Sequence, residues 1–160
     1  MGADLYIPAL RTPALLSPLQ SAFDAACLAR DSLPDSASPS EREAAQSAVS
    51  SAHSALYSAP SYFRDSYNES SLLSRIGLSW WTDVIPLCEA SSCPPSSECN
   101  IDVPHLQSFL SLLSSRAPRG TALPFPASPS DDPSYFTSKL ERLYSFLDSA
   151  ILHGGAYFSL

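Results

Sequence analysis

Residues 133–155 of this 160-residue chain, PSYFTSKLERLYSFLDSAILHGG, contain its clearest helical pattern. Large apolar side chains recur at intervals of three and four residues, which places them on one face of an α-helix. The two closing glycines can adopt the left-handed conformation that ends a helix. We therefore predict a helix from Pro133 to His153, with one apolar face formed by Phe136, Leu140, Leu143, Leu147 and Ile151.

Proline marks the start of this helix and of two others, each time behind a side chain that can cap the helix. Proline fits the first helical position, and Ser or Asp before it can accept a hydrogen bond from a free backbone N–H. The three starts are Ser17-Pro18-Leu19-Gln20, Ser38-Pro39-Ser40-Glu41 and Asp132-Pro133, of which the first two match the capping-box pattern. We predict that the two helices after Ser17 and Ser38 form an antiparallel hairpin, since small residues on the second permit close approach.

The middle of the chain predicts shorter helices. One spans about 69–76, with Asn68 as a plausible cap and Gly77 as its stop. Ser79 can cap a second segment, WWTDVI, which Pro86 must kink or end because it lacks a backbone donor. The alternative is one helix that continues through Gly77. A further helix follows Pro104, with an apolar stripe formed by Leu106, Phe109, Leu110 and Leu113.

The predicted fold is mainly α, a single compact domain of five or six helices that spans residues 1–160. Both ends of the chain, Asp4–Ile7 and 156–160, carry weakly alternating residues that favour strands. They could pair as a small two-stranded ribbon. The Pro/Ser-rich stretches 89–103 and 117–131 are predicted to be long loops.

The composition disfavours two classes of function. Nine basic and sixteen acidic residues give a net charge of −7, so nucleic acid and anionic membrane surfaces are not expected partners. No segment approaches the 18 or so apolar residues of a membrane span, and the first residues do not resemble a secretory leader. We expect a soluble, acidic, serine-rich protein of the cytoplasm.

The most informative polar segment is YFRDSYNESSLLSRIGLSWWTD, residues 62–83, which holds five of the sixteen aromatic residues. Aromatic side chains with a polar tip and the planar arginine fork are common where a packed surface meets a ligand. If the segment were helical, Arg64 would share a face with Asn68, and Asp65 with Glu69. The candidate binding residues are Arg64, Asp65, Tyr67, Asn68, Trp80, Trp81 and Asp83. The bland alternative is a salt-bridge and capping network around a core tryptophan.

A second constellation is Cys88, Cys93, Cys99 and His105, spaced C-x4-C-x5-C-x5-H. Three thiolates and one imidazole can hold zinc tetrahedrally. However, the last gap is longer than in the usual nucleic-acid-binding fingers, and basic and aromatic residues are absent around the cysteines. The simpler interpretation, which we favour over zinc, is a variable Ser/Pro loop with spare thiols or a disulfide formed after purification. We predict no cofactor and no metal requirement, with these four as the candidate ligands if one exists.

Several blocks resemble a group of small bacterial proteins described only as hypothetical. These blocks are GADLYI at the start, YFRDSYN and GLSWWTDVIP in the middle, and YF-x3-L-x-R-L-x-x-FL-x-x-AI with a final SL at the end. The resemblance implies one intact domain that includes both termini, and it implies no activity. The Ser-rich second helix and the Cys-bearing loop depart from the more charged segments of that group.

Function is not established by these patterns, and three hypotheses remain. The first is a non-enzymatic binding or interaction protein that presents the 62–83 surface to a protein partner or a small anionic ligand. The second is a small hydrolase-type enzyme with Asp65 or Asp83 as general base and Arg64 as an electrostatic clamp. The third is a zinc-stabilised module. Burial of both Trp80 and Trp81 would weaken the first hypothesis.

Overall fold

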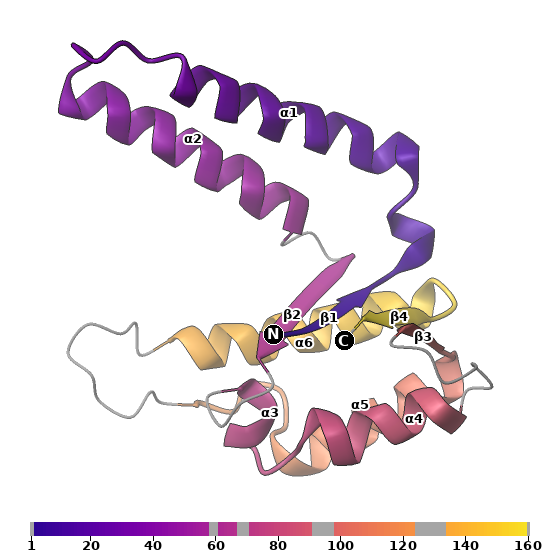
Figure 1. The fold of residues 1–160 in the computed structure, drawn as a ribbon. Helices are drawn as coiled ribbons and strands as arrows, with labels where there is room; N and C mark the ends of the chain where they lie inside the picture. The colour runs from indigo at the N-terminus through magenta and orange to yellow at the C-terminus, as the bar shows by residue number, and fades with distance from the viewer. Residues whose placement is uncertain (1, 58–60, 67–70, 91–97, 124–133, 160) are drawn as a thin grey trace. The chain divides into compact units, whose positions relative to one another are not determined.

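The computed structural model describes residues 2–57, 61–66, 71–90, 98–123 and 134–159. Over this part of the chain the fold is mainly α, as predicted, with six α-helices and a small antiparallel sheet (Figure 1). The predicted domain is built from two compact units. We call Leu10–Ala59 the hairpin unit, and Met1–Ala9 together with Pro60–Leu160 the sheet unit.

The sheet unit contains four antiparallel strands in the order β2-β1-β4-β3. They are β1 (Gly2–Tyr6), β2 (Tyr62–Ser66), β3 (Glu98–Ile101) and β4 (Ala156–Ser159). The two terminal strands pair in the centre of the sheet, as predicted, with Leu5 opposite Phe158. The sheet is larger than the predicted two-stranded ribbon, because β2 and β3 extend it on both sides. A ribbon of two strands is marginal in water, and the added strands create a face wide enough to bury.

Both added strands lie where the sequence analysis expected other structure. Side chains of the segment YFRDS alternate between the two faces of β2, so that Phe63 and Asp65 are buried and Arg64 is exposed. The shared helical faces predicted for Arg64 with Asn68 and for Asp65 with Glu69 therefore do not exist. Residues 98–101 form β3, with Asn100 opposite Tyr157, although 89–103 was predicted to be a loop. That prediction was wrong for residues 98–101, because this polar segment becomes a strand by pairing with β4. Strand propensity within the segment does not reveal such a pairing. Residues 117–123 form no helix or strand, whereas 124–131 lie outside the described residues.

The core lies on one face of the sheet, against α6 (Tyr135–Leu152), which crosses this face in Figure 1. The Phe63 and Phe146 rings are 6.3 Å apart between centroids. Four of the five residues predicted for the apolar face of α6 are buried, and Ile151 is half-buried. The start of α6 predicted at Asp132-Pro133 lies outside the described residues. The helix predicted after Pro104 is α5 (Val103–Arg116), whose first turn is capped by the Asp102 carboxylate.

The middle of the sheet unit contains separate short helices, which decides between the two alternatives. Ser71 caps α3 (Leu72–Arg75) by accepting a hydrogen bond from the Ser74 N–H, and Gly77 follows with a φ of 73°. Asn68, the predicted cap, lies outside the described residues. Ser79 caps a π-helical turn, η2 (Trp80–Val84), that runs directly into α4 (Ile85–Ala90). Pro86 does not end this helix, because the wider turn bonds the Ile85 N–H to the Trp80 carbonyl just before the missing donor.

The hairpin unit consists of α1 (Pro13–Asp31) and α2 (Pro39–Tyr57), antiparallel to each other as predicted (Figure 1). The capping box at Ser38 is confirmed: the Glu41 carboxylate accepts from the Ser38 N–H at 2.7 Å, and the Ser38 hydroxyl accepts from the Glu41 N–H at 3.3 Å. α1 begins at Pro13, behind Thr12, rather than at the predicted Ser17-Pro18. Pro18 therefore lies inside α1, where it removes one backbone donor and its ring crowds the Ala14 carbonyl, so it weakens the first half of the helix.

Gly154 and Gly155 allow a test of how tightly β4 is joined to the end of α6. Both have positive φ, but a Cβ on Gly155 would lie 2.9 Å from the Ile101 carbonyl oxygen, whereas a Cβ on Gly154 meets no atom within 4 Å. Gly155→Ala should therefore lower the free energy of unfolding by about 1–3 kcal/mol from backbone strain alone, with the steric contact in addition.

Gly154→Ala is the matched control, with an expected loss of about 1 kcal/mol. Urea unfolding of the two variants measures the difference. Equal losses would mean that the close approach to Ile101 does not constrain this turn.

Candidate functional site

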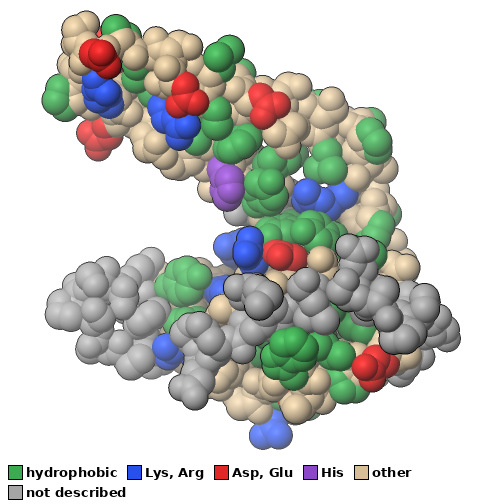
Figure 2. Space-filling model, in the orientation of Figure 1, with side chains coloured by type: hydrophobic (Ala, Val, Ile, Leu, Met, Phe, Trp, Pro, Cys, Tyr) green, Lys and Arg blue, Asp and Glu red, His purple; other side chains and the backbone are tan. Residues whose placement is uncertain are grey.

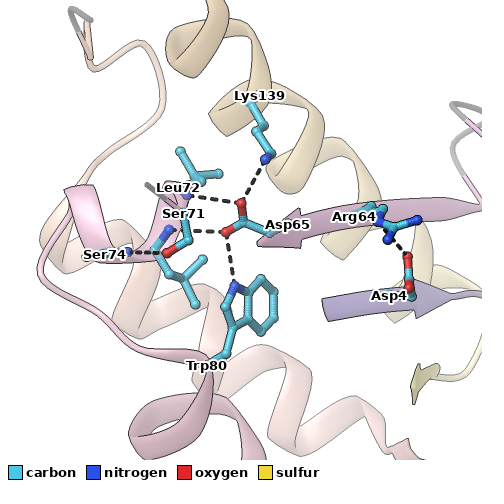
Figure 3. Close-up of polar contacts among 9 residues, drawn as sticks. Asp4, Arg64, Asp65, Ser71, Leu72, Ser74, Trp80 and Lys139 are labelled. Carbon is cyan, nitrogen blue, oxygen red and sulfur yellow. Dashed lines mark hydrogen bonds and ion pairs between the residues drawn. The ribbon is translucent and has the colours of Figure 1, made fainter. Parts of the chain in front are cut away.

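The buried carboxylate of Asp65 is the centre of the polar structure in the segment 62–83. Its side chain is completely shielded from solvent and is surrounded by four donors (Figure 3). One oxygen accepts from the Lys139 ammonium at 2.7 Å and from the Leu72 N–H at 3.0 Å. The other accepts from the Trp80 indole N–H at 3.0 Å and from the Leu73 N–H at 3.3 Å. We call these groups the Asp65 cluster.

The four donors of the Asp65 cluster come from three elements of the sheet unit besides β2. The alternation of β2 turns Asp65 toward the core, and the Ser71 cap directs the free N–H groups of α3 at its carboxylate. Trp80 opens η2 and stacks on Phe158 at 5.8 Å between ring centroids. Lys139 reaches the cluster from α6 and is only 12% exposed. A buried charge that is both paired and hydrogen-bonded joins β2, α3, η2 and α6, which is a structural role.

Arg64 lies on the opposite face of the sheet from Asp65, because neighbouring residues of a strand point to opposite sides. Its guanidinium is 3.6 Å from the Asp4 carboxylate, and its side chain is 62% exposed. The Tyr62 hydroxyl also donates a hydrogen bond to Asp4. Tyr6, which is opposite both Tyr62 and Tyr157, lies with its ring 5.1 Å and 6.3 Å from theirs. We call Asp4, Tyr6, Tyr62, Arg64 and Tyr157 the tyrosine face.

Two groups of the tyrosine face, Tyr62 and Arg64, have a raised pKa. Burial, followed by the hydrogen bond to Asp4, raises the pKa of the Tyr62 hydroxyl, so this group is protonated at neutral pH. The negative charge of Asp4 raises the pKa of Arg64. Asp4 is thus held between a neutral donor and a cation. The arrangement offers hydroxyls, aromatic surface and one exposed guanidinium, and it offers no activated nucleophile.

The structure separates the predicted binding residues rather than bringing them together. Trp80 is buried in the core, whereas Trp81 is 56% exposed, so only one of the two predicted tryptophans lies at the surface. Asp83 accepts a hydrogen bond from the Ser79 N–H at 2.7 Å and helps to start η2. Tyr67 and Asn68 lie outside the described residues. Of the predicted set, Arg64 alone is placed on the tyrosine face.

The predicted zinc ligands are only partly described. Cys88 is buried, and the Nδ1 atom of His105 contacts the Asp102 carboxylate. Cys93 and the side chain of Cys99 lie outside the described part of the chain. In that part, no group of three His, Cys, Asp or Glu side chains is placed to hold a metal ion.

Two important residues, Lys139 and Asp4, were not found from the sequence. Lys139 is 74 residues from Asp65, and Asp4 is 58 residues from Tyr62. A signal for Lys139 existed in its position on the buried side of α6, between Phe136 and Leu140, where a cation needs a partner. Nothing local signals the pairing of Asp4, since it depends on which strands become neighbours.

Comparison with protein-family models, curated proteins and solved structures finds no match for this chain. Among the described helices, none has both the length and the apolar character needed to cross a bilayer.

The Asp65 cluster predicts a large cost for removing one of its two charges. Asp65→Asn preserves the shape of the side chain but leaves Lys139 buried without a counter-charge, so the free energy of unfolding should fall by about 3–5 kcal/mol in urea titrations. Combining it with Lys139→Met removes the stranded charge, so the double variant should regain part of the loss.

Arg64→Ala is the comparison on the other face of the same strand. Because Arg64 and Asp4 form a largely exposed pair, this change should cost no more than about 1 kcal/mol. A loss below that level for Asp65→Asn would contradict the structural role of the cluster.

Proposed function

We propose that this chain is a non-enzymatic binding protein whose contact surface is the tyrosine face. The observation that carries the proposal is the composition of this face: the exposed Arg64 lies with the half-buried Tyr6 and Tyr157 and the buried Tyr62, on a sheet whose other face is filled by the core. Tyrosine and arginine are the residues most enriched at the energetic centres of protein interfaces. They supply large contact areas and directed hydrogen bonds at a small cost in side-chain entropy.

The rigidity of the strand supports the same proposal. Asp65 is tied to three other elements, so the backbone of the adjacent Arg64 is held in place before any partner arrives. Ring contacts between Tyr6 and its two neighbours restrict the tyrosines in the same way. A preorganised surface loses less conformational entropy on association.

A protein partner is better supported than a small anionic ligand. The guanidinium of Arg64 is the only cation on the tyrosine face, and the carboxylate of Asp4 beside it offsets its charge. A compact anion would meet both groups at once and gain little net attraction. A protein surface can instead use the guanidinium donors, the hydroxyls and the aromatic area separately.

The hydrolase hypothesis has less support. A general base needs an oxygen free to take a proton from a substrate or water, within hydrogen-bond reach. Both oxygens of Asp65 are occupied, by four donors in all, which removes it as a base. Asp83 accepts both of its hydrogen bonds on Oδ2, from the Ser79 N–H and the Thr82 hydroxyl, which fix it as a cap at the start of η2.

The proposal predicts that a partner cross-links to the tyrosine face and to no other tyrosine-bearing surface. A photoreactive phenylalanine analogue placed at Tyr157 should trap a discrete partner band in lysate. The same analogue at Tyr135, a half-exposed tyrosine on α6, is the matched control and should not.

The affinity for the trapped partner then tests Arg64. Arg64→Ala should weaken binding at least about tenfold, which corresponds to about 1.4 kcal/mol, without lowering the melting temperature by more than a few degrees. Arg142→Ala, an exposed arginine on α6, should bind as the original chain does. Identical cross-links from both tyrosine positions, or equal affinities for the two arginine variants, would remove the proposal's support.

A further inference from the structure

β2 is an outer strand of the sheet, because the strand order is β2-β1-β4-β3 (Figure 1). Its register to β1 decides where its backbone groups point. The Ile7 N–H donates to the Ser61 carbonyl, two residues beyond the pair Leu5–Phe63 in the same register. Bonded pairs recur at every second residue of antiparallel strands, so the odd-numbered residues of β2 are bonded to β1. The even-numbered residues, Arg64 among them, therefore direct their N–H and C=O groups to the outer side.

The outer side of β2 is not paired with any other described strand. Within the residues that the structure describes, the backbone N–H and C=O groups of Arg64 and Ser66 have no hydrogen-bond partner. The Arg64 side chain does not cover this edge, because it leans over β1: a Cβ added to Gly2 would lie 3.0 Å from its Nε atom. Free backbone groups at a sheet edge are a template for a further extended strand.

The charge of Arg64 decides which strand fits this edge. Arg64 is the middle residue of β2, so two copies of the chain that paired through β2 would place Arg64 opposite Arg64 in the register with the most backbone bonds. Like charges directly opposite each other destabilise a strand pair. A central charge of this kind protects an edge from pairing with itself. It leaves the edge open to a strand that carries the opposite charge at that position.

We infer that β2 accepts an extended segment of another protein as a fifth strand, antiparallel to β2, with an acidic residue opposite Arg64. In this mode of recognition the main-chain hydrogen bonds give affinity and alternate side chains give specificity. The inference deepens the proposed function and rests on it, because Arg64 belongs to the tyrosine face. The acidic side chain of the added strand lies on that same face of the sheet.

A carboxylate on the added strand avoids the difficulty that a free anion meets at this face. Neighbouring strands are about 4.8 Å apart, so the added strand lies about 10 Å from β1 and from the backbone of Asp4. Figure 3 shows the Arg64 guanidinium reaching over β1 to Asp4, at 3.6 Å. Figure 2 shows basic and acidic side chains side by side at the surface of the sheet unit. Such a largely exposed pair contributes little, so the guanidinium can turn back across β2 to the new carboxylate.

Amide hydrogen exchange of the full chain, followed by NMR, tests the inference with short peptides. The probe is the acetylated and amidated peptide Thr-Val-Glu-Val-Thr at about 10 mM. It should slow exchange of the Arg64 N–H at least about threefold, because the bound strand occupies this donor. The N–H of Asp35, an exposed residue in the link between α1 and α2, is the control and should exchange at its original rate.

Two matched peptides separate strand addition from simple charge attraction. Thr-Val-Lys-Val-Thr should protect the Arg64 N–H less than the glutamate peptide does, because it places like charges opposite each other. The glutamate peptide N-methylated at glutamate keeps its carboxylate but has no N–H for the Arg64 carbonyl, so it should also protect less. Arg64→Glu should reverse the order of the glutamate and lysine peptides, a gain of binding that only a folded variant can show.

Protection by the glutamate peptide below threefold overturns the inference, as does equal protection by either matched peptide. The proposed function is judged separately, by the cross-link at Tyr157. A partner trapped at Tyr157 together with an unprotected Arg64 N–H would overturn strand addition alone. A chain that traps nothing at Tyr157 loses the proposed function itself, whatever the peptides do.

Discussion

The contact between the Asp65 carboxylate and the Lys139 ammonium is the constraint on which the sheet unit depends. Both charges are largely shielded from solvent, so the two side chains must stay in contact. If either moved away, the other would be left as an uncompensated buried charge. This ion pair holds β2 against α6. The Leu72 N–H of α3 and the Trp80 indole N–H of η2 bind the same carboxylate, so these two elements are held at the same place. Apolar packing tolerates small shifts, whereas this arrangement of four donors around one carboxylate does not.

The same constraint explains why the candidate surface lies where it does. Once Asp65 faces the core, the alternation of β2 requires Arg64 to face the other way, toward Asp4 on β1. The aromatic and charged residues that are close together in the sequence therefore serve two different purposes. Those that point inward build the fold, and those that point outward form the surface that we propose as the contact site.

Periodicity predicted the helices well because a helix is a local structure. The apolar stripe of α6 and the capping box of α2 could both be inferred from residues near each other. The pairing of the two ends was expected only from the strand-favouring residues in each, because it joins opposite ends of the chain. The strand at Glu98–Ile101 could not be inferred, since its order comes from β4, more than fifty residues later. The separation of Arg64 from Asp65 could not be predicted for the same reason. Helical spacing placed Arg64 beside Asn68, and only the pairing of β2 with β1 shows that Arg64 lies beside Asp4.

The hairpin unit enters and leaves the sheet unit at adjacent points. Ile7 and Ser61, on either side of it, are joined by a backbone hydrogen bond of 2.9 Å that continues the ladder between β1 and β2. In topological terms the hairpin unit is an insertion in a β-hairpin, at a position where two residues would suffice as a turn. Such an element can lengthen, shorten or diverge in sequence without changing a single contact inside the Asp65 cluster. The Asp65 cluster therefore places no constraint on the length or sequence of these serine- and alanine-rich helices.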